Sequence, residues 1–346
     1  MGLARICGWI AVALAVTAAP ALAGEPVPIA VASQSGVYAS LPLFIASEKG
    51  WWEAVGLKPV LLRFGGSEFQ LEETGWDVGQ LDPLAALRAA ADDAELLTVG
   101  IADDESDANV VMARPKEVET IIADPAAIKG KTLLLTPGST AEYAALACLA
   151  RWRVKREEVH VIAREQPDIV TSFAAADDGL AALTAPDNYT VFEAGAGITV
   201  CSGKDAAAAI PGALVARAAF AAAHPERVAR FVAVVLHAIA WQKTHRDETI
   251  ALMRRYYEDN GVYLGEDSLA QEIDTRPTFT LSEQLQLLDR SKGGVSTADG
   301  WFGRLAAYLL SAGAFDAPPL GQSYLTDRYL KWAAGDPALH AFVDGE

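Results

Sequence analysis

The chain has 346 residues, of which 51% are hydrophobic, and a formal net charge of −17. This hydrophobic fraction excludes an intrinsically disordered chain. The acidic balance argues against nucleic acid and anionic membrane surfaces as partners, because both require clustered Lys and Arg. Residues 24–346 are too many for one small core and suit two lobes.

Residues 1–23 predict a secretory signal peptide. Arg5 gives a charged start, an apolar stretch over 8–16 follows, and residues 21–23 form a small-x-small cleavage site. The apolar stretch is shorter than the ~20 residues that a membrane-spanning helix needs. We therefore expect cleavage before Gly24 and a periplasmic location. A lipoprotein is disfavoured, because Gly24 stands where an acylated cysteine would be required.

From residue 27 the chain alternates short apolar runs with helical patterns, which is typical of βαβ units and a parallel sheet. The first strands are expected at 27–33, 60–64, 76–80 and 96–101. The helices between them are expected at 43–54 and 83–91. An acidic stretch over 102–108 then interrupts the pattern, and we expect it to be a solvated or hinge-adjacent turn.

A second alternation follows and predicts a second lobe inserted into the first. Its strands are expected at 109–114, 132–135, 160–162, 179–183 and 197–201, and its helices at 141–152 and 168–175. A strand at 212–217 would return to the first lobe. The remainder is predicted to be helical at 225–244, 247–259, 282–289, 298–312 and 324–334. Lobe 1 would thus comprise 24–108 and 212–346, and lobe 2 would comprise 109–211.

No constellation for catalysis or metal binding is found. Gly130-Lys131-Thr132 lacks the glycine of a phosphate-binding loop, since Pro125 stands in its place. The five histidines are scattered, and no serine occupies a GxSxG turn. The acidic run 103–105 lacks the spacing of a calcium loop. We expect no enzyme activity, no cofactor and no metal.

The mature chain contains two cysteines, Cys148 and Cys201. An oxidising compartment would favour a disulfide between them. The alternative is two buried thiols that act as small apolar side chains. Both positions fall in the predicted second lobe, and a bridge requires Cα atoms within ~7 Å.

Several segments in collinear order resemble one protein family. PLFIASEKGWWE at 42–53 is similar to the first helix of the nitrate/sulfonate/taurine class of ABC importer binding proteins. Further segments of the same likeness are WDVG at 76–79, IKGKT at 128–132, PGST at 137–140, APDNY at 185–189 and SYLTD at 323–327. The resemblance implies a periplasmic binding protein type II fold, with two α/β lobes, two crossovers and a ligand cleft. It also implies an ABC permease and ATPase as partners, and we expect a monomer.

The predicted ligand-binding residues follow strands, where ligands of open α/β sheets bind. They are Ser35, Tyr38, Ser67, Asp82, Ser139, Thr140, Tyr143, Pro186 and Asn188. Ser139 or Thr140 can cap the helix that begins there and leave backbone N–H groups for a sulfonate, carboxylate or nitrate oxygen. The alternative is a plain helix cap without a ligand.

Departures from the family pattern concern charge and pocket width. Thr184 stands where an aromatic residue is frequent, and Asp82 stands where a small neutral residue is usual. Glu68 and Glu142 also fall in strand-end loops, and Arg164 is the obvious basic candidate there. A zwitterion with its ammonium near Asp82 or Glu142 would use these carboxylates, whereas nitrate would be repelled by them. The alternative is that both carboxylates face solvent.

The sequence leaves other functions open within the same fold. The ligand could be nitrate, an aromatic acid or a pyrimidine in place of a sulfonate. Thiamine-pyrimidine synthases and chorismate-type dehydratases resemble such binding proteins, but the Cys- and His-rich motif of the former is absent and neither would carry a secretory signal. A role in ligand sensing with a membrane receptor is a third alternative.

Overall fold

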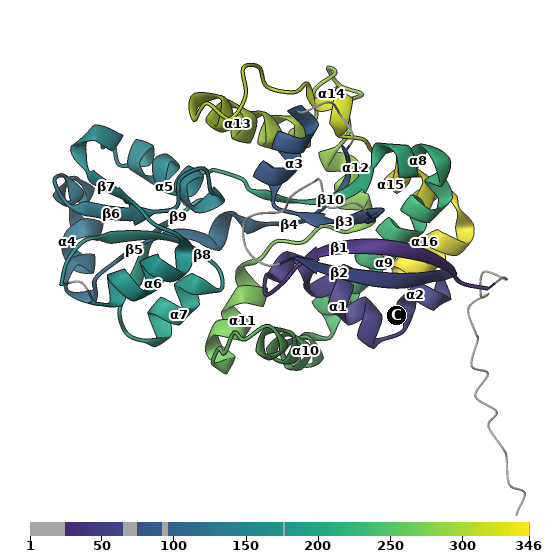
Figure 1. Cartoon of the computed structure of the whole chain (residues 1–346), viewed down its shortest axis with the longest axis horizontal. Coiled ribbons are helices and arrows are strands. Elements are labelled where there is room, and N and C mark those ends of the chain that lie inside the picture. The colour runs from purple at the N-terminus through teal and green to yellow at the C-terminus, as the bar shows by residue number, and fades with distance from the viewer. Residues whose placement is uncertain (1–24, 65–74, 92–95, 176, 346) are drawn as a thin grey trace, which may run out of the picture.

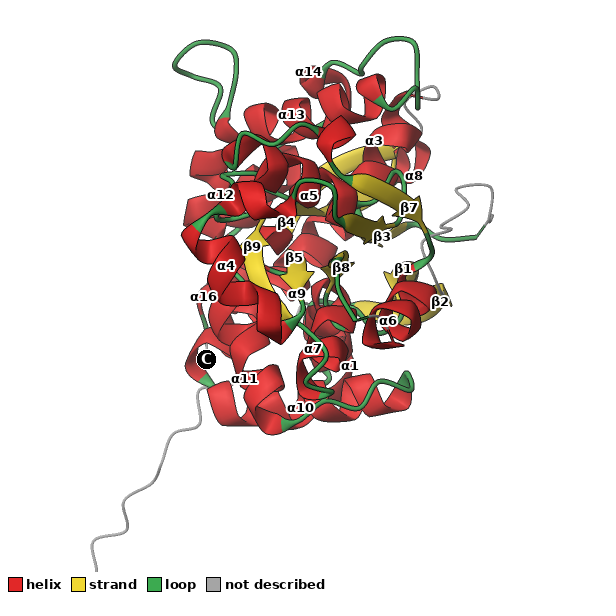
Figure 2. Cartoon of the chain, turned by 90° about the vertical axis from the view of Figure 1, so that its left-hand side faces the viewer, coloured by secondary structure: helices red, strands yellow, loops and turns green. Residues whose placement is uncertain are grey.

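The computed structural model describes residues 25–64, 75–91, 96–175 and 177–345, so the predicted signal peptide lies outside the described residues. Figure 1 shows two lobes side by side, and each is built on one five-stranded sheet. Helices surround the strands, as Figure 2 shows from the side of the second lobe. No helix among the described residues is long and apolar enough to cross a membrane.

The sheet of lobe 1 has the strand order β2-β1-β3-β10-β4. Its strands are β1 (Val27–Gln34), β2 (Leu57–Phe64), β3 (Val78–Leu81), β4 (Leu96–Asp104) and β10 (Pro211–Arg217). β10 runs antiparallel to both of its neighbours, while β1 is parallel to β2 and β3. Gly79 is required where β3 meets β1, because a Cβ there would lie 2.5 Å from the carbonyl oxygen of Ala32.

The sheet of lobe 2 has the order β7-β6-β8-β5-β9 and repeats the arrangement of lobe 1. Its strands are β5 (Asn109–Ala113), β6 (Thr132–Leu135), β7 (His160–Ala163), β8 (Leu180–Thr184) and β9 (Ile198–Ser202). β5 is the antiparallel strand here, in the place that β10 takes in lobe 1. The chain passes between the sheets twice, from β4 to β5 and from β9 to β10. The predicted type II fold is confirmed; the lobe boundaries in residue numbers stay a prediction.

The helices lie between and after the strands. Those up to β9 are α1 (Leu41–Glu48), α2 (Trp51–Ala54), α3 (Pro83–Ala91), α4 (Val118–Ala123), α5 (Thr140–Arg151), α6 (Gln166–Ala175) and α7 (Asp187–Glu193). The helices after β10 are α8 (Ala218–Ala223), α9 (Pro225–Thr244), α10 (Arg246–Asp259), α11 (Glu266–Thr275), α12 (Leu281–Leu287), α13 (Thr297–Ser311), α14 (Gly321–Tyr324), α15 (Arg328–Gly335) and α16 (Pro337–Asp344). The long helix α9 is buried against the sheet of lobe 1, with α1, α15 and α16 around it.

Two expectations for the elements were wrong in detail, and several helices were not predicted. The helix expected at 43–54 is broken at Gly50, whose φ of 70° favours glycine. The acidic stretch does not end the strand, since β4 continues through Asp104 and pairs with Pro211. Helix α11 was not predicted, and neither were the helices α4, α7, α8 and α16. The polar sequence of α11 gives only a short apolar stripe.

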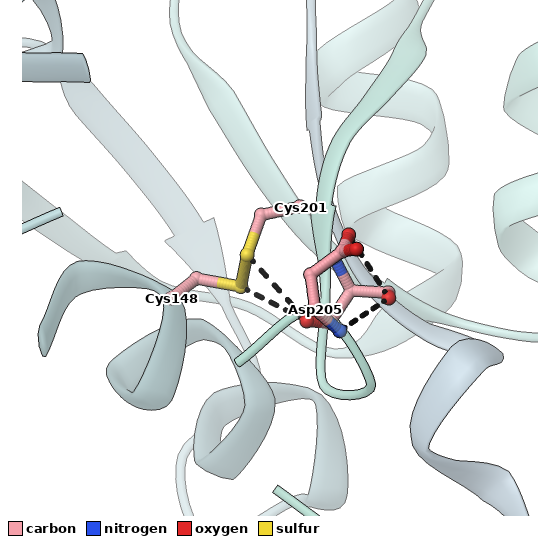
Figure 3. The surroundings of a disulfide bond; sticks show 4 residues. Cys148, Cys201 and Asp205 are labelled. Carbon is pink, nitrogen blue, oxygen red and sulfur yellow. Dashed lines mark hydrogen bonds between the residues drawn. A yellow bond between two sulfur atoms is a disulfide. The ribbon is translucent and has the colours of Figure 1, made fainter. Parts of the chain in front are cut away.

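The two cysteines form a disulfide, which decides between the two alternatives (Figure 3). Their Cα atoms are 6.1 Å apart, and the bond joins α5 to the end of β9 across 53 residues of sequence. Both residues are buried in the core of lobe 2. The bridge therefore ties the strand that precedes the second crossover to the helix that begins at Thr140.

Candidate functional site

Loops from the two lobes meet between the sheets. The Arg88 guanidinium on α3 donates to the carbonyl oxygen of Gly138 in lobe 2 at 2.9 Å. The Gly265 amide, before α11, donates to a carboxylate oxygen of Glu193 on α7 at 2.8 Å. Figure 1 shows α13 on one side of this meeting zone and α11 on the other. We call it the strand-end region, because the loops after β1, β3, β6 and β8 lead into it.

Ser139 acts as the N-cap of α5. Its hydroxyl accepts from the Glu142 amide at 3.1 Å and donates to the carbonyl of Thr136 at 2.7 Å. The capping role expected from the sequence is thus present, and it uses the O–H donor and one acceptor site of this hydroxyl. Thr140, which is buried, makes no side-chain hydrogen bond among the described contacts. Of the two predicted residues, Thr140 is the one whose hydroxyl is available.

Glu142 joins the lobes and does not face solvent. One carboxylate oxygen accepts from the Gly138 amide at 2.7 Å and from the Tyr308 hydroxyl on α13 at 2.6 Å. Tyr143 packs its ring against that of Tyr308 with centroids 5.5 Å apart. Burial and the Glu142 carboxylate raise the pKa of Tyr308. Both donors bind the same oxygen, so the other oxygen of Glu142 has no donor among the described residues, and a contact with a ligand ammonium stays a prediction.

The predicted ligand-binding residues of lobe 1 make different contacts within the protein. Asp82 caps α3 by accepting from the amides of Leu84 and Ala85 at 2.8 and 3.0 Å. Asp82 is partly buried, and the loss of hydration raises the pKa of its carboxyl group although these two hydrogen bonds oppose the change. Tyr38 is buried with its ring 4.9 Å from the Arg276 guanidinium. Ser35 is partly buried, and its amide donates to the carbonyl of Phe64.

The predicted residues of lobe 2 after β8 lie at the start of α7. Pro186 follows a cis peptide bond and precedes the helix. Asn188 is buried, and its side-chain oxygen accepts from the Tyr189 amide at 2.8 Å. Leu264, which precedes α11, packs against the apolar cluster that contains Tyr189, so the two lobes approach here. Ser67 and Glu68 lie outside the described residues.

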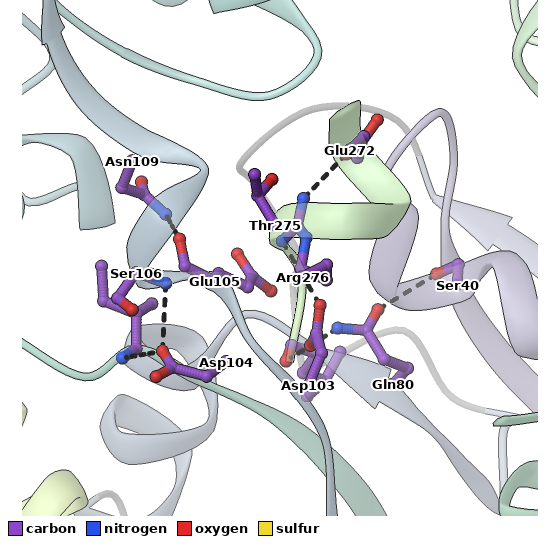
Figure 4. A network of polar contacts seen from close by, with 12 residues as sticks. Ser40, Gln80, Asp103, Asp104, Glu105, Ser106, Asn109, Glu272, Thr275 and Arg276 are labelled. Atoms are coloured by element: carbon purple, nitrogen blue, oxygen red, sulfur yellow. Dashed lines mark hydrogen bonds and ion pairs between the residues drawn. The ribbon is translucent and has the colours of Figure 1, made fainter. Parts of the chain in front are cut away.

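A charged group at the first crossover was not predicted as part of the site (Figure 4). We call Asp103, Glu105, Glu272 and Arg276 the hinge cluster. Arg276, just after α11, lies 3.3 Å from a carboxylate oxygen of Asp103 and 2.8 Å from one of Glu272. The Tyr257 hydroxyl donates to the other oxygen of Glu272 at 2.7 Å.

The electrostatics of the hinge cluster depart from those of a surface ion pair. Burial raises the pKa of Asp103 to about 7, although Arg276 opposes the change. Burial, followed by the charge of Asp103, raises the pKa of Glu105 well above its usual range. Burial lowers the pKa of Arg276, but the Asp103 and Glu272 carboxylates outweigh it and the pKa is raised. The predicted solvated turn is thus wrong for Asp103, which is 1% exposed, while its place beside a crossover is confirmed.

Two arginines other than the predicted Arg164 contact the strand-end region. Arg164 is exposed at the end of β7 and bonds its neighbour's carbonyl. Arg88 and Arg276 contact the region instead. Arg276 could not be found from the pattern, because it follows a helix that the sequence does not signal and acts on residues 173 positions away.

Two hollows on the described surface lie elsewhere. One of about 370 Å³ is formed by the C-terminal helices, including Leu285 and His340. Another of about 570 Å³ lies beside the disulfide, with Arg151 and Asp205 in its wall. Neither lies at the carboxyl ends of the parallel strands, where α/β proteins of this kind bind ligands. The described residues hold no group of three or more His, Cys, Asp or Glu placed for a metal ion.

The chain is similar in sequence to bacterial binding proteins. A Brucella abortus (strain 2308) binding protein is 24% identical over 320 residues, which cover 90% of this chain and 94% of the relative. An aliphatic sulfonates-binding protein of Bacillus subtilis (strain 168) is 28% identical over 228 residues, 63% of this chain and 67% of the relative.

Solved structures with the same fold include a binding protein and an enzyme. The periplasmic aliphatic sulphonate binding protein SsuA from Escherichia coli matches with a TM-score of 0.72 at 16% identity, covering 87% of this chain and 92% of that chain. The desulfurization enzyme DSZB matches with a TM-score of 0.64 at 16% identity, covering 89% of this chain and 99% of that chain. The fold alone therefore does not separate binding from catalysis. A family model matches residues 38–249, which is more than half of the chain, so the chain belongs to the NMT1/THI5-like family.

Proposed function

We propose that the chain is the solute-binding component of an ABC importer and holds a small organic ligand, a sulfonate or related zwitterion, between its lobes. The observation that carries the proposal is the meeting of strand-end loops from two similar sheets that are joined by only two crossovers. Such an arrangement suits hinge closure around a ligand. The sulfonate-binding relatives support this ligand class.

The anionic end of the ligand would bind at the start of α5. This helix has 12 residues, and its first turn offers the unoccupied hydroxyl of Thr140. A helix N-terminus favours negative charge, because its amides and dipole point toward the ligand. Arg88 lies close by, since it bonds Gly138 one residue before the cap. Tyr38, Asp82, Tyr143, Pro186 and Asn188 would line the space around the ligand.

Closure would act through bonds between the lobes. Tyr308 with Glu142 holds one side, and Gly265 with Glu193 holds the other. These bonds can form only when the lobes are together, so they would favour the closed form that the permease recognises. We further propose that residues 24–108 with 212–346 and residues 109–211 are the moving units. Export through a cleaved signal peptide would place a monomer in the periplasm beside its permease and ATPase.

A ligand screen tests this function. Purified protein from residue 24 onward would be heated with alkyl sulfonates, amino-sulfonates, nitrate, aromatic acids and pyrimidines. A ligand that binds only the folded state raises stability by about 2.7 kcal/mol at a hundredfold excess over its Kd. We expect stabilisation by the sulfonates, and Thr140→Ala should weaken it more than Thr120→Ala on the exposed surface of α4. Stabilisation by nitrate or a pyrimidine alone would assign a different ligand, and none at all would contradict the proposal.

A further inference from the structure

We infer that Asp103, Glu105 and Asp82 form a subsite for an organic cation, the ammonium or guanidinium end of the ligand, beside the hinge. The inference rests on the proposed function, which it deepens by naming the charge that the ligand carries. Within the proposed ligand class it selects a zwitterion, whose anionic end lies at the start of α5 and whose cationic end lies at the hinge.

Asp103 supplies the observation that points to a ligand. It is 1% exposed, and one carboxylate oxygen pairs with Arg276, whereas its Oδ1 has no hydrogen-bond partner. A buried carboxylate oxygen without a donor is costly, and native proteins rarely leave one without a reason. A Cβ on Gly212 would lie 2.3 Å from this oxygen and 3.3 Å from Oε1 of Glu105. Both carboxylates therefore face the same side of Gly212, where the missing side chain lets Oδ1 of Asp103 lie against the backbone.

Glu105 and Asp82 give the subsite its access. Both are only partly buried, and the Glu105 side chain makes no hydrogen bond among the described contacts. Figure 4 shows it extending from the crossover toward Arg276 and Asp103. The charge of Asp82 also contributes to the raised pKa of Glu105. A donor group on the ligand could reach Glu105 from its partly exposed side without entering the core.

The charge balance of the cluster calls for one more cation. Arg276 is already bonded to both Asp103 and Glu272, and no other described guanidinium or ammonium pairs with Glu105. Buried carboxylates without counter-charges take up protons instead of ionising. The raised pKa values of Asp82, Asp103 and Glu105 agree with this. A ligand cation would replace those protons with a stronger charge-assisted contact.

An organic cation fits the geometry better than a metal ion. The carboxylates are not grouped as a metal would require in the described part of the chain. One oxygen of Asp82 also accepts from the amides of α3, and one oxygen of Asp103 accepts from Arg276. The other oxygen of Asp82, the other of Asp103 and both of Glu105 remain without a donor among the described residues, and separate acceptors of this kind suit the several N–H donors of an ammonium or guanidinium.

Matched ligands and two variants test the subsite. Binding of 2-aminoethanesulfonate and ethanesulfonate would be measured by calorimetry at pH 7.5 with the wild type, Glu105→Gln and the exposed control Glu119→Gln. We expect the amino compound to bind about tenfold more tightly to the wild type and the control, as one charge-assisted hydrogen bond allows. Glu105→Gln should reduce the preference to less than about threefold, with an unchanged Tm. Glu105 is the primary change because, unlike Asp103, its carboxylate holds no partner.

The outcomes separate the two proposals. If ethanesulfonate binds as tightly as its amino analogue, or if Glu105→Gln keeps the preference, the subsite is refuted while sulfonate binding stands. If Glu105→Gln lowers the Tm strongly, Asp82→Asn serves as the second variant with the same criterion. If neither compound binds the folded wild type, the proposed sulfonate class fails and the subsite fails with it.

Discussion

Tyr308→Phe should shift the lobes toward the open form. The hydroxyl of Tyr308 donates to the Glu142 carboxylate over 2.6 Å, and the tyrosine is only 9% exposed. The bond connects α13 of lobe 1 with α5 of lobe 2, so it contributes only when the lobes are together. The raised pKa of Tyr308 keeps its hydroxyl protonated, and therefore a donor, throughout the neutral pH range. Phenylalanine keeps the ring contact with Tyr143 and removes this hydrogen bond.

The size of the shift toward the open form can be estimated from the strength of this hydrogen bond. A hydrogen bond to a charged group contributes about 1.5–3 kcal/mol, and little is lost to solvent at this exposure. The closing equilibrium should therefore fall by about tenfold to a hundredfold. Where closure is needed for binding, the apparent Kd rises by the same factor once the open form predominates. Glu142 keeps its bond from the Gly138 amide, so the start of α5 stays intact.

Two measurements check the prediction. Small-angle X-ray scattering would give the radius of gyration without ligand, which should increase in Tyr308→Phe, and calorimetry would give the Kd of the ligand found in the screen. Tyr263→Phe is the matched control, because Tyr263 is 75% exposed. An unchanged radius together with an unchanged Kd would show that this bond does not hold the lobes together.

Three further predictions concern stability and the helix start. Replacing Cys148 and Cys201 by alanine should lower the free energy of unfolding by about 4 kcal/mol, because the bridge closes a loop of 53 residues; denaturant titration measures it, and a loss below ~1 kcal/mol would contradict it. Ser139→Ala should cost about 0.5–2 kcal/mol of stability as a lost cap, whereas Thr140→Ala should mainly weaken ligand affinity; equal effects of both on affinity would refute this division. Burial lowers the pKa of His237 in the folded chain. Below pH ~6.5 the unfolded chain therefore binds a proton at His237 more readily than the folded chain does, and the free energy of unfolding decreases as the pH falls. Between pH 8 and 5 this free energy should decrease less in His237→Gln than in the wild type, and an equal decrease would show that His237 does not cause it.

The ten strands could be predicted because each contains a short apolar run, although the bounds of β2 and β4 were not found. Strand β6 begins just after Gly130 and ends before Pro137, and β10 begins at Pro211, so local signals mark the ends. Helix α5 was found for a similar reason, since Ser139 caps it directly after the strand. Local chemistry was sufficient wherever one residue fixes the geometry of its own neighbours.

The strand-end residues were placed correctly in the chain, but their partners could not be read from it. Glu142 fits a free acidic side chain in sequence, yet it accepts from Tyr308, which lies 166 positions further on. Ser139 was expected to serve either the helix or the ligand, and the structure shows a hydroxyl already engaged on both sides. The pattern fixes which groups stand at the strand ends, and tertiary contacts decide which of them are available.

The hinge cluster illustrates this limit in its strongest form. An acidic run is ordinarily solvated, because a buried charge without a partner is costly. Asp103 escapes the rule only because α11 brings Arg276 against it, and α11 itself has a polar sequence that gives no strong helical signal. Even then one guanidinium serves both Asp103 and Glu272, and no salt bridge to Glu105 is found among the described residues. In our proposal the cationic end of the ligand supplies the missing positive charge at this point, where the chain first crosses between the lobes.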